Sequence, residues 1–111
     1  MASHNKGLLL VMADIDPEDE DEFNRWYNQE HLPGRLSVPG FVSGRRYRAI
    51  DGSPKYLALY ELESSEVLNS KEYRAVSKEN ETQWSKRMFK KWKNTVRNVY
   101  VEIDLDEKSE S

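Results

Sequence analysis

The chain has 111 residues, with 17 Lys and Arg against 20 Asp and Glu, so its formal net charge is −3. This length suits one domain with a single core and is too short for two catalytic domains. The absence of Cys excludes disulfides and a cysteine nucleophile, and two His are too few for a three-His metal site. The longest apolar run, Leu8–Ala13, is far short of the roughly 20 residues that a membrane helix needs. We therefore expect one soluble domain that does not interact with membranes.

The sequence divides into a central domain and two short ends. We expect residues 7–103 to form the domain, residues 1–6 a flexible N-terminus and residues 104–111 an acidic flexible tail. The first six residues have no apolar stretch or cleavage site of a signal peptide, which favours a cytoplasmic protein.

The domain is predicted to begin with a strand and a helix. The nearly continuous apolar run of Lys6–Ala13 predicts a buried strand. Asp16 and Pro17 are typical of a helix start, and acidic residues follow them where the helix dipole is positive. The helix is predicted over Pro17–His31, because Pro33 disfavours a helical conformation of the residue before it.

A β-hairpin is predicted next. The segments Phe41–Ile50 and Tyr56–Leu62 both alternate in polarity, and the Asp-Gly sequence between them favours a turn. In a regular first strand, Arg46 would share a face with Val42.

The sequence of the second half of the domain predicts another helix and a last strand. Large apolar residues recur at helical spacing within Lys78–Asn94, and Val96–Ile103 alternates as a strand does. The basic residues at the end of this helix, like the acidic ones at the start of the first, are explained by the helix dipoles.

The element order is therefore β-α-β-β-α-β, which predicts a ferredoxin-like α+β fold with two helices on one face of a four-stranded antiparallel sheet. All four strands carry apolar residues on both sides, although two helices can cover only one side. We therefore expect a homodimer that packs sheet against sheet.

The most informative polar residues lie on the first predicted helix. Glu30 shares an apolar stripe with Phe23, Trp26 and Tyr27, and His31 follows it at the helix end. An imidazole at the border between an apolar face and a loop suits proton transfer near neutral pH. A structural alternative stays open, in which His31 caps the helix and Glu30 pairs with an arginine.

The other polar residues each have a functional and a structural interpretation. Arg46 can anchor a carboxylate or enolate oxygen, or it can guard an edge strand. Tyr56, Tyr60 and Tyr100 can line a pocket or pack at a dimer interface. The basic stretch Lys86–Arg97 is more typical of a solvated helix face than of a nucleic-acid surface, given the net negative charge. Neither a metal site nor a nucleotide cofactor is expected, because metal-ligand clusters and glycine-rich phosphate loops are missing.

Several motifs together resemble the EthD-like family of the dimeric α+β barrel superfamily. They are Phe23-x-x-Trp26-Tyr27-x-x-Glu30-His31-Leu32-Pro33, Pro39-Gly40-Phe41, Arg45-Arg46-Tyr47 and the strand Tyr56–Leu62. The resemblance covers residues 8–62 well and the rest by pattern only. It implies a ferredoxin-like subunit, a dimeric barrel and a small cavity between each sheet and its helices. It also implies an acid–base role for His31, whereas the second His of many relatives has no counterpart in the strands or the C-terminal half.

We therefore expect a cofactor-independent enzyme that isomerises, cyclises or decarboxylates a small cyclic or aromatic oxygenated compound through an enol or enolate. His31 is expected to transfer the proton and Arg46 to hold an acidic or enolic oxygen. The expected substrate-binding residues are Trp26, Tyr27, Glu30 and Tyr60. Cofactor-free monooxygenation is less favoured, because the substrate itself must supply electrons to oxygen. The alternatives are a non-catalytic ligand-binding or stress-response dimer of the same fold, and a structural dimer with a filled core.

Overall fold

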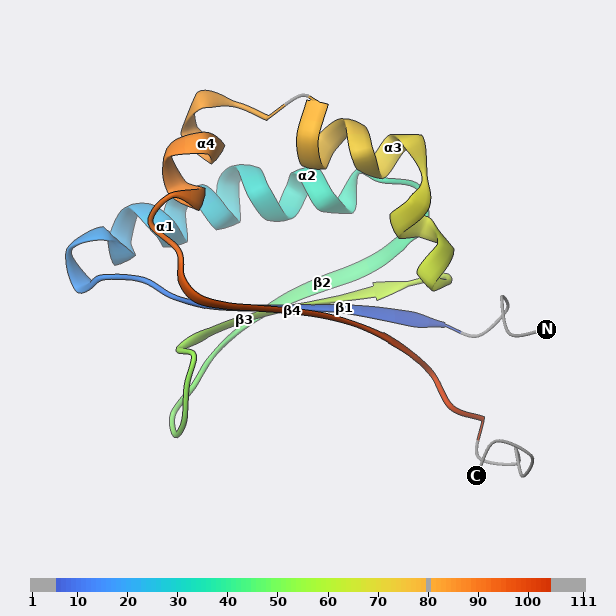
Figure 1. The fold of residues 1–111 in the computed structure, drawn as a ribbon, viewed down its shortest axis with the longest axis horizontal. Helices are drawn as coiled ribbons and strands as arrows, with labels where there is room; N and C mark the ends of the chain where they lie inside the picture. The colour runs from blue at the N-terminus through green and yellow to red at the C-terminus, as the bar shows by residue number, and fades with distance from the viewer. Residues whose placement is uncertain (1–5, 80, 105–111) are drawn as a thin grey trace.

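The computed structural model describes residues 6–79 and 81–104, so the predicted flexible ends lie mostly outside the described residues. Four strands form one antiparallel sheet in the order β2-β3-β1-β4, with every labelled helix on one side of it (Figure 1). The strands are β1 (Gly7–Asp14), β2 (Phe41–Arg48), β3 (Tyr56–Leu62) and β4 (Lys93–Val101). This is the ferredoxin-like α+β fold that the sequence predicts.

The first helical region is longer than predicted. A short 3-10 turn at Pro17–Asp19 leads into α1 (Glu20–Trp26), and a π-helical turn at Tyr27–His31 joins α1 to α2 (Leu32–Leu36). The predicted end at His31 is therefore wrong.

The π-helical turn explains how a proline fits inside this helix. Leu32 is helical, and its backbone N–H donates to the carbonyl of Tyr27, five residues earlier. In a regular α-helix, the Pro33 ring would clash with the carbonyl four residues before it. The wider turn relieves that clash, as insertions of this kind do within helices.

The second helical region is broken into shorter pieces. It contains a 3-10 turn at Ser65–Asn69, α3 (Lys71–Arg74), a π-helical turn at Ala75–Glu79 and α4 (Gln83–Phe89). The predicted continuous helix over Lys78–Asn94 is wrong, because α4 ends at Phe89 and β4 begins at Lys93. Trp92 lies beyond the helix end and still packs against the core.

The core between sheet and helices is built largely from aromatic rings. Phe23 and Trp26 of α1 are fully buried, and Tyr60 of β3 is almost so. The Phe23 ring packs against Tyr27, Tyr56 and Trp92 at centroid distances of 5.1 to 6.1 Å. The alternation predicted for β3 is confirmed, because Tyr56, Ala58, Tyr60 and Leu62 are the buried residues of that strand.

A bulge in β2 changes which of its residues face the helices. Phe41 pairs with Leu62, but Ser43 pairs with Glu61, so Val42 is an extra residue in the strand. Phe41 is buried and Val42 is exposed. Arg46 therefore shares the helix-facing side with Phe41 rather than with Val42, which corrects the regular alternation expected from the sequence.

The other face of the sheet has no helix over it (Figure 1). The register places four polar residues on it, Ser43, Arg45, Glu61 and Asn98, beside a larger number of apolar ones. Strand alternation and register place on it Leu8, Leu10, Met12, Leu57 and Leu59, with Tyr47 and Tyr100 at its sides. We call these seven residues the outer face. Tyr47 and Tyr100 are each nearly half exposed.

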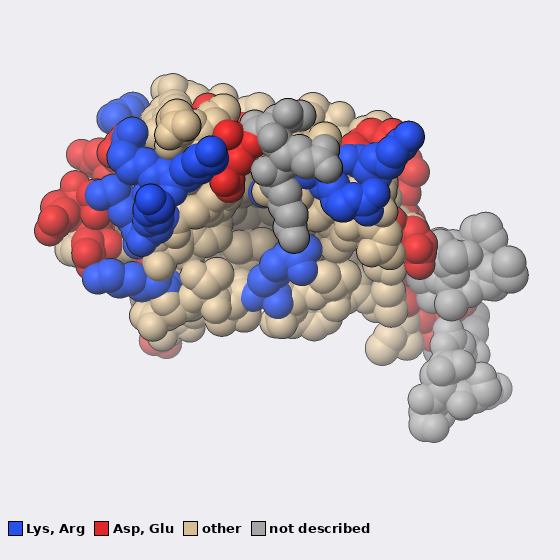
Figure 2. All heavy atoms as spheres, turned by 45° about the horizontal axis from the view of Figure 1, so that its top comes forward, with Lys and Arg blue, Asp and Glu red and all other residues tan. Residues whose placement is uncertain are grey.

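The acidic and basic runs meet in space. Lys91 pairs with Asp19 at 3.2 Å, Lys93 with Asp16 at 2.7 Å, and Arg87 with Glu22. Figure 2 shows acidic and basic side chains side by side at one end of the molecule. In addition to the expected effect of the helix dipoles, these charges therefore act as partners of one another across the fold.

In the part of the chain that the structure describes, no helix is long and apolar enough to cross a membrane.

Candidate functional site

His31 lies at the end of the π-helical turn, inside a cluster of aromatic rings. Its side chain is buried, with 7% of the residue exposed. The imidazole stacks on Trp26 at a centroid distance of 4.6 Å and meets the rings of Tyr27 and Phe89 edge-on at 4.7 and 5.4 Å. These contacts on several sides hold the imidazole in one orientation.

Burial and nearby positive charge keep His31 neutral. Burial is the largest cause, followed by the charges of Arg35 and Arg46, and together they lower the pKa of His31 to about 2. A neutral imidazole has one nitrogen that can accept a proton and one that can donate a hydrogen bond.

His31 borders two cavities. The inner cavity, about 150 Å³, lies between the sheet and the helical layer, and the outer cavity, about 180 Å³, lies among the helices. The polar and charged residues around the inner cavity are His31, Arg35, Thr95 and Arg97. Its aromatic walls are Tyr60, Tyr73, Phe89 and Trp92. Arg35 lines both cavities together with His31. A positively charged guanidinium and a neutral imidazole therefore lie side by side at each cavity.

Two residues that line the inner cavity have a deeply buried polar atom. The Tyr60 hydroxyl lies beside Tyr27, with which it interacts, and the Trp92 indole nitrogen has no hydrogen-bond partner among the described residues. Burial, followed by the neighbouring Tyr27, raises the pKa of Tyr60 above its ordinary value, so its hydroxyl stays protonated. Buried donors without partners are uncommon in proteins and often mark a place where something else binds.

Glu30 lines the outer cavity and joins the two helical regions. Its carboxylate accepts hydrogen bonds from Ser85 at 2.7 Å, from Thr82 at 2.5 Å and from the Trp26 indole at 3.3 Å. Burial opposes ionisation, but these three donors outweigh it and hold the pKa of Glu30 below its ordinary value. Glu30 therefore anchors the start of α4 to the helix that carries His31.

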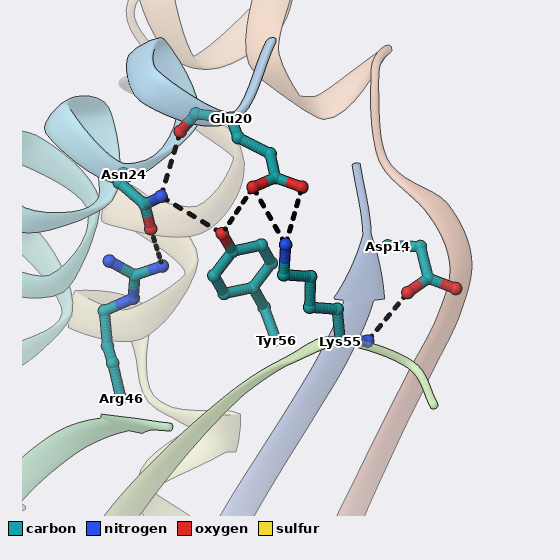
Figure 3. A network of polar contacts seen from close by, with 6 residues as sticks. All are labelled: Asp14, Glu20, Asn24, Arg46, Lys55 and Tyr56. Atoms are coloured by element: carbon teal, nitrogen blue, oxygen red, sulfur yellow. Dashed lines mark hydrogen bonds and ion pairs between the residues drawn. The ribbon is translucent and has the colours of Figure 1, made fainter. Parts of the chain in front are cut away.

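Arg46 lines neither of the two cavities. Its guanidinium donates to the side-chain oxygens of Asn24 at 2.7 Å and Asn28 at 2.9 Å, and its carbon lies 4.4 Å from the centre of the Tyr27 ring. Figure 3 shows the arginine reaching up from β2 to Asn24. Arg46 thus acts on His31 through its charge and through Tyr27.

The network around Arg46 continues along the first helix (Figure 3). Asn24 donates to the Tyr56 hydroxyl at 3.3 Å, and that hydroxyl donates to Glu20 at 3.1 Å. Lys55 also binds Glu20, at 2.9 Å. The network fixes α1 to the strands beneath it.

Trp26 and Tyr27 are core residues rather than lining residues of the two cavities. Both are almost completely buried, and both pack directly against His31. Of the six residues expected at the site, the structure places His31 and Tyr60 on the inner cavity and Glu30 on the outer one.

Sequence reasoning missed the two arginines of the inner cavity. Arg35 follows His31 by four residues, a spacing that places both on one helix face. The sequence prediction does not use this spacing, because it ends the helix at His31. Arg97 belongs to the basic stretch Lys86–Arg97, which the sequence assigns to a solvated helix face; this is wrong for Arg97, because it lies in β4 and its pairing with Val11 places it on the helix-facing side.

No group of three or more His, Asp or Glu side chains among the described residues is placed to hold a metal ion.

The sequence matches the family described as "Domain of unknown function (DUF4286)" over residues 7–103, and the chain belongs to this family. Among curated proteins, no relative matches.

Solved structures show the same fold at low sequence identity. A dimeric ferredoxin-like protein from an uncultured marine organism has a TM-score of 0.69 at 18% identity, covering 97% of this chain and 96% of its own. SnoaB, a cofactor-independent oxygenase from Streptomyces nogalater, has a TM-score of 0.68 at 13% identity over 93% and 99%. An EthD family protein from Bacillus halodurans has a TM-score of 0.61 at 19% identity over 87% and 99%. These structural similarities show that the chain has the same fold as these three proteins.

Proposed function

We propose that the protein is a cofactor-independent enzyme that moves a proton on a small enolisable compound bound in the inner cavity. The observation that carries the proposal is that His31 and Arg35 line this cavity together. One supplies a neutral base and the other a fixed positive charge, and enolate chemistry needs both.

In the proposed reaction, the bond between a carbon and its acidic hydrogen breaks, and the proton passes to the free nitrogen of His31. The electron pair stays on the substrate as an enolate, whose oxygen is stabilised by the Arg35 guanidinium. The same imidazolium then returns the proton to another carbon or to an oxygen. In a decarboxylation no C–H bond breaks: the bond to the carboxylate carbon breaks instead, its electron pair forms the enolate as CO₂ leaves, and the freed carbon takes a proton from water. Isomerisation, cyclisation and decarboxylation all pass through an enolate intermediate of this kind.

The low basicity of His31 in the empty site is compatible with this role. Its pKa is lowered by burial and by positive charge. An enolate beside Arg35 places a negative charge next to the imidazole, and an opposite charge at short range favours the protonated form. Proton transfer and enolate formation therefore assist each other in the occupied cavity.

The remaining expected site residues receive separate roles in this proposal. Tyr60 contacts the substrate, because it lines the cavity and its hydroxyl stays protonated. Trp26, Tyr27 and Arg46 position His31 through ring contacts and charge, and Glu30 holds the helix. These positioning residues do not touch the reacting atoms.

The comparisons support the proposal at the level of the fold. SnoaB, a cofactor-independent oxygenase, and an EthD family protein share it. Together with the motif Glu30-His31-Leu32-Pro33, this likeness supports our proposal that the chain is EthD-like within its family.

We also propose that the chain forms a homodimer through the outer face. The dimeric ferredoxin-like protein shares the fold. An apolar sheet face without a helix over it favours burial against a second copy.

The test is hydrogen exchange in D₂O with phenylpyruvate and 2-oxocyclohexanecarboxylate as probes, followed by NMR of the acidic C–H protons. We expect the protein to accelerate exchange, and His31→Gln to reduce that acceleration about 10²- to 10⁴-fold. His4→Gln, which changes the other histidine in the same way, is the matched control and keeps the rate.

Two outcomes contradict the proposed activity. One is no acceleration of either probe over buffer, and the other is full exchange in His31→Gln. Stabilisation by the probes without any exchange would instead support the ligand-binding alternative.

A further inference from the structure

Two arginines at the inner cavity have no acidic partner among the residues that the structure describes. Arg35 comes from α2 and Arg97 from β4, and both line the cavity. The ion pairs between described residues involve Lys55, Arg87, Lys91 and Lys93 instead. An arginine next to a cavity without a carboxylate to bind leaves hydrogen-bond donors available for an anion.

The present contacts of both arginines are weak and meet at one residue. Arg97 donates to the Tyr73 hydroxyl at 3.3 Å. The Arg35 guanidinium lies 5.7 Å from the centre of the same ring, and its bond to the Val76 carbonyl is long, at 3.4 Å. Tyr73 thus lies between two cationic groups that approach the cavity from opposite layers of the fold.

Arg46 is not available for this role. Its guanidinium is held by Asn24 and Asn28 and lies outside the cavity. The positive charges that an anion would meet in the cavity are therefore those of Arg35 and Arg97.

The rest of the cavity suits a flat apolar body. No Asp or Glu is among its lining residues, and four of them are aromatic. Its volume of about 150 Å³ equals that of an engineered cavity known to take up benzene. The space-filling view shows a hollow between the helical layer and the sheet, with basic side chains close to its opening (Figure 2).

From these contacts we propose that the inner cavity binds a single-ring aromatic monoanion, with its carboxylate between Arg35 and Arg97 and its ring against Phe89 and Trp92. This names the substrate class of the same site and so rests on the location given under the proposed function. The carboxylate supplies the missing acidic partner of both guanidinium groups. The ring fills the apolar part of the cavity and displaces water from its aromatic walls.

The test measures binding of benzoate by calorimetry and by tryptophan fluorescence, because Trp92 lines the cavity. Benzamide has the same shape without the charge, and cyclohexanecarboxylate has the charge without the aromatic ring. We expect benzoate to bind about tenfold or more tightly than benzamide, and also more tightly than cyclohexanecarboxylate.

Substitutions of the two arginines test where the carboxylate of benzoate binds. Arg35→Gln and Arg97→Gln should each weaken benzoate binding about tenfold and leave benzamide unaffected. Arg74→Gln is the matched control, because Arg74 is an exposed arginine of α3 that lines neither cavity. Arg35→Lys keeps the charge and should retain part of the affinity, so it separates loss of the anion site from loss of folding.

Equal binding of benzoate and benzamide, or benzoate binding that is unchanged in both glutamine variants, would overturn the assignment. Benzoate has no enolisable hydrogen, so these results do not depend on catalysis. Benzoate binding without exchange of the enolisable probes would refute the proposed activity alone. Exchange without any preference for the anion would refute the ligand class alone.

Discussion

Arg35 lines the same two cavities as His31, although a proline lies between them in the chain. The π-helical turn makes this possible, because it lets the helix pass Pro33 and continue to Leu36. The consequence is electrostatic. A buried imidazole shares its site with a permanent cation, which favours the neutral base in the empty cavity and an anion in the occupied one.

The stability of the protein should depend on pH through His31. The pKa of His31 is lowered to about 2 in the folded chain, against about 6.5 when unfolded. Between these values the unfolded chain binds a proton that the folded chain does not. Stability therefore falls as the pH drops below about 6.5, by up to about 1.4 kcal/mol per pH unit from this group.

The variant His31→Gln removes that contribution. Urea unfolding at several pH values from 7 to 4 should give a shallower decline for the variant than for the unchanged protein. The acidic residues contribute equally to both, so the difference in slope isolates the histidine. Parallel curves would show that the pKa of His31 is not lowered on folding.

Arg46→Met should destabilise the fold by about 1–3 kcal/mol. The change removes the hydrogen bonds to Asn24 and Asn28 and the contact with the Tyr27 ring. Arg25→Met is the control, because Arg25 is an exposed arginine of α1. Chemical denaturation measures both. A loss in Arg46→Met no larger than in Arg25→Met would mean that the network in Figure 3 contributes little.

Glu30→Gln should destabilise the protein by about 1–3 kcal/mol, because three donors converge on this carboxylate. The pKa of Glu30 is lowered, so its contribution is present above the ordinary value and is lost as the pH falls through the folded value. The difference in the free energy of unfolding between the unchanged protein and Glu30→Gln should therefore disappear in strong acid. Glu66→Gln, at an exposed position, serves as the comparison. A gap independent of pH would contradict this account.

Two glycines should respond in opposite ways to replacement by alanine. Gly40 has a φ of +98°, and a Cβ there would lie 2.4 Å from a methyl group of Val67, so Gly40→Ala should destabilise by about 1–3 kcal/mol. Gly34 lies in α2 with open space around it, and Gly34→Ala should stabilise by about 0.5–1 kcal/mol. Thermal unfolding distinguishes them. Shifts of the same sign in both variants would be inconsistent with these conformations.

The outer face should control the oligomeric state. We expect a dimer by light scattering, and Leu10→Asp should convert it to a monomer by placing a charge in the middle of the apolar sheet face. Ile50→Asp introduces the same charge at a fully exposed turn residue and should leave the dimer intact. A monomeric unchanged protein would refute the homodimer.

The fold could be predicted from sequence because each strand shows its polarity pattern locally. The strand Tyr56–Leu62 was predicted with its observed limits, and its buried residues alternate as expected. The prediction fails where an irregularity interrupts the regular spacing of apolar residues along a helix or strand. The π-helical turn before Pro33 hid the spacing between His31 and Arg35, and the bulge at Val42 put Arg46 on the same side as Phe41. Such interruptions depend on tertiary packing, which a period cannot show.

The bulge at Val42 also bears on how this strand can vary in evolution. It adds one residue to β2, and without it Ser43, Arg45 and Tyr47 would turn toward the helices while Arg46 would turn away. A single-codon deletion there would exchange the two sides of the strand at once. Substitutions along β2 should therefore be tolerated far more readily among relatives than insertions or deletions at its start.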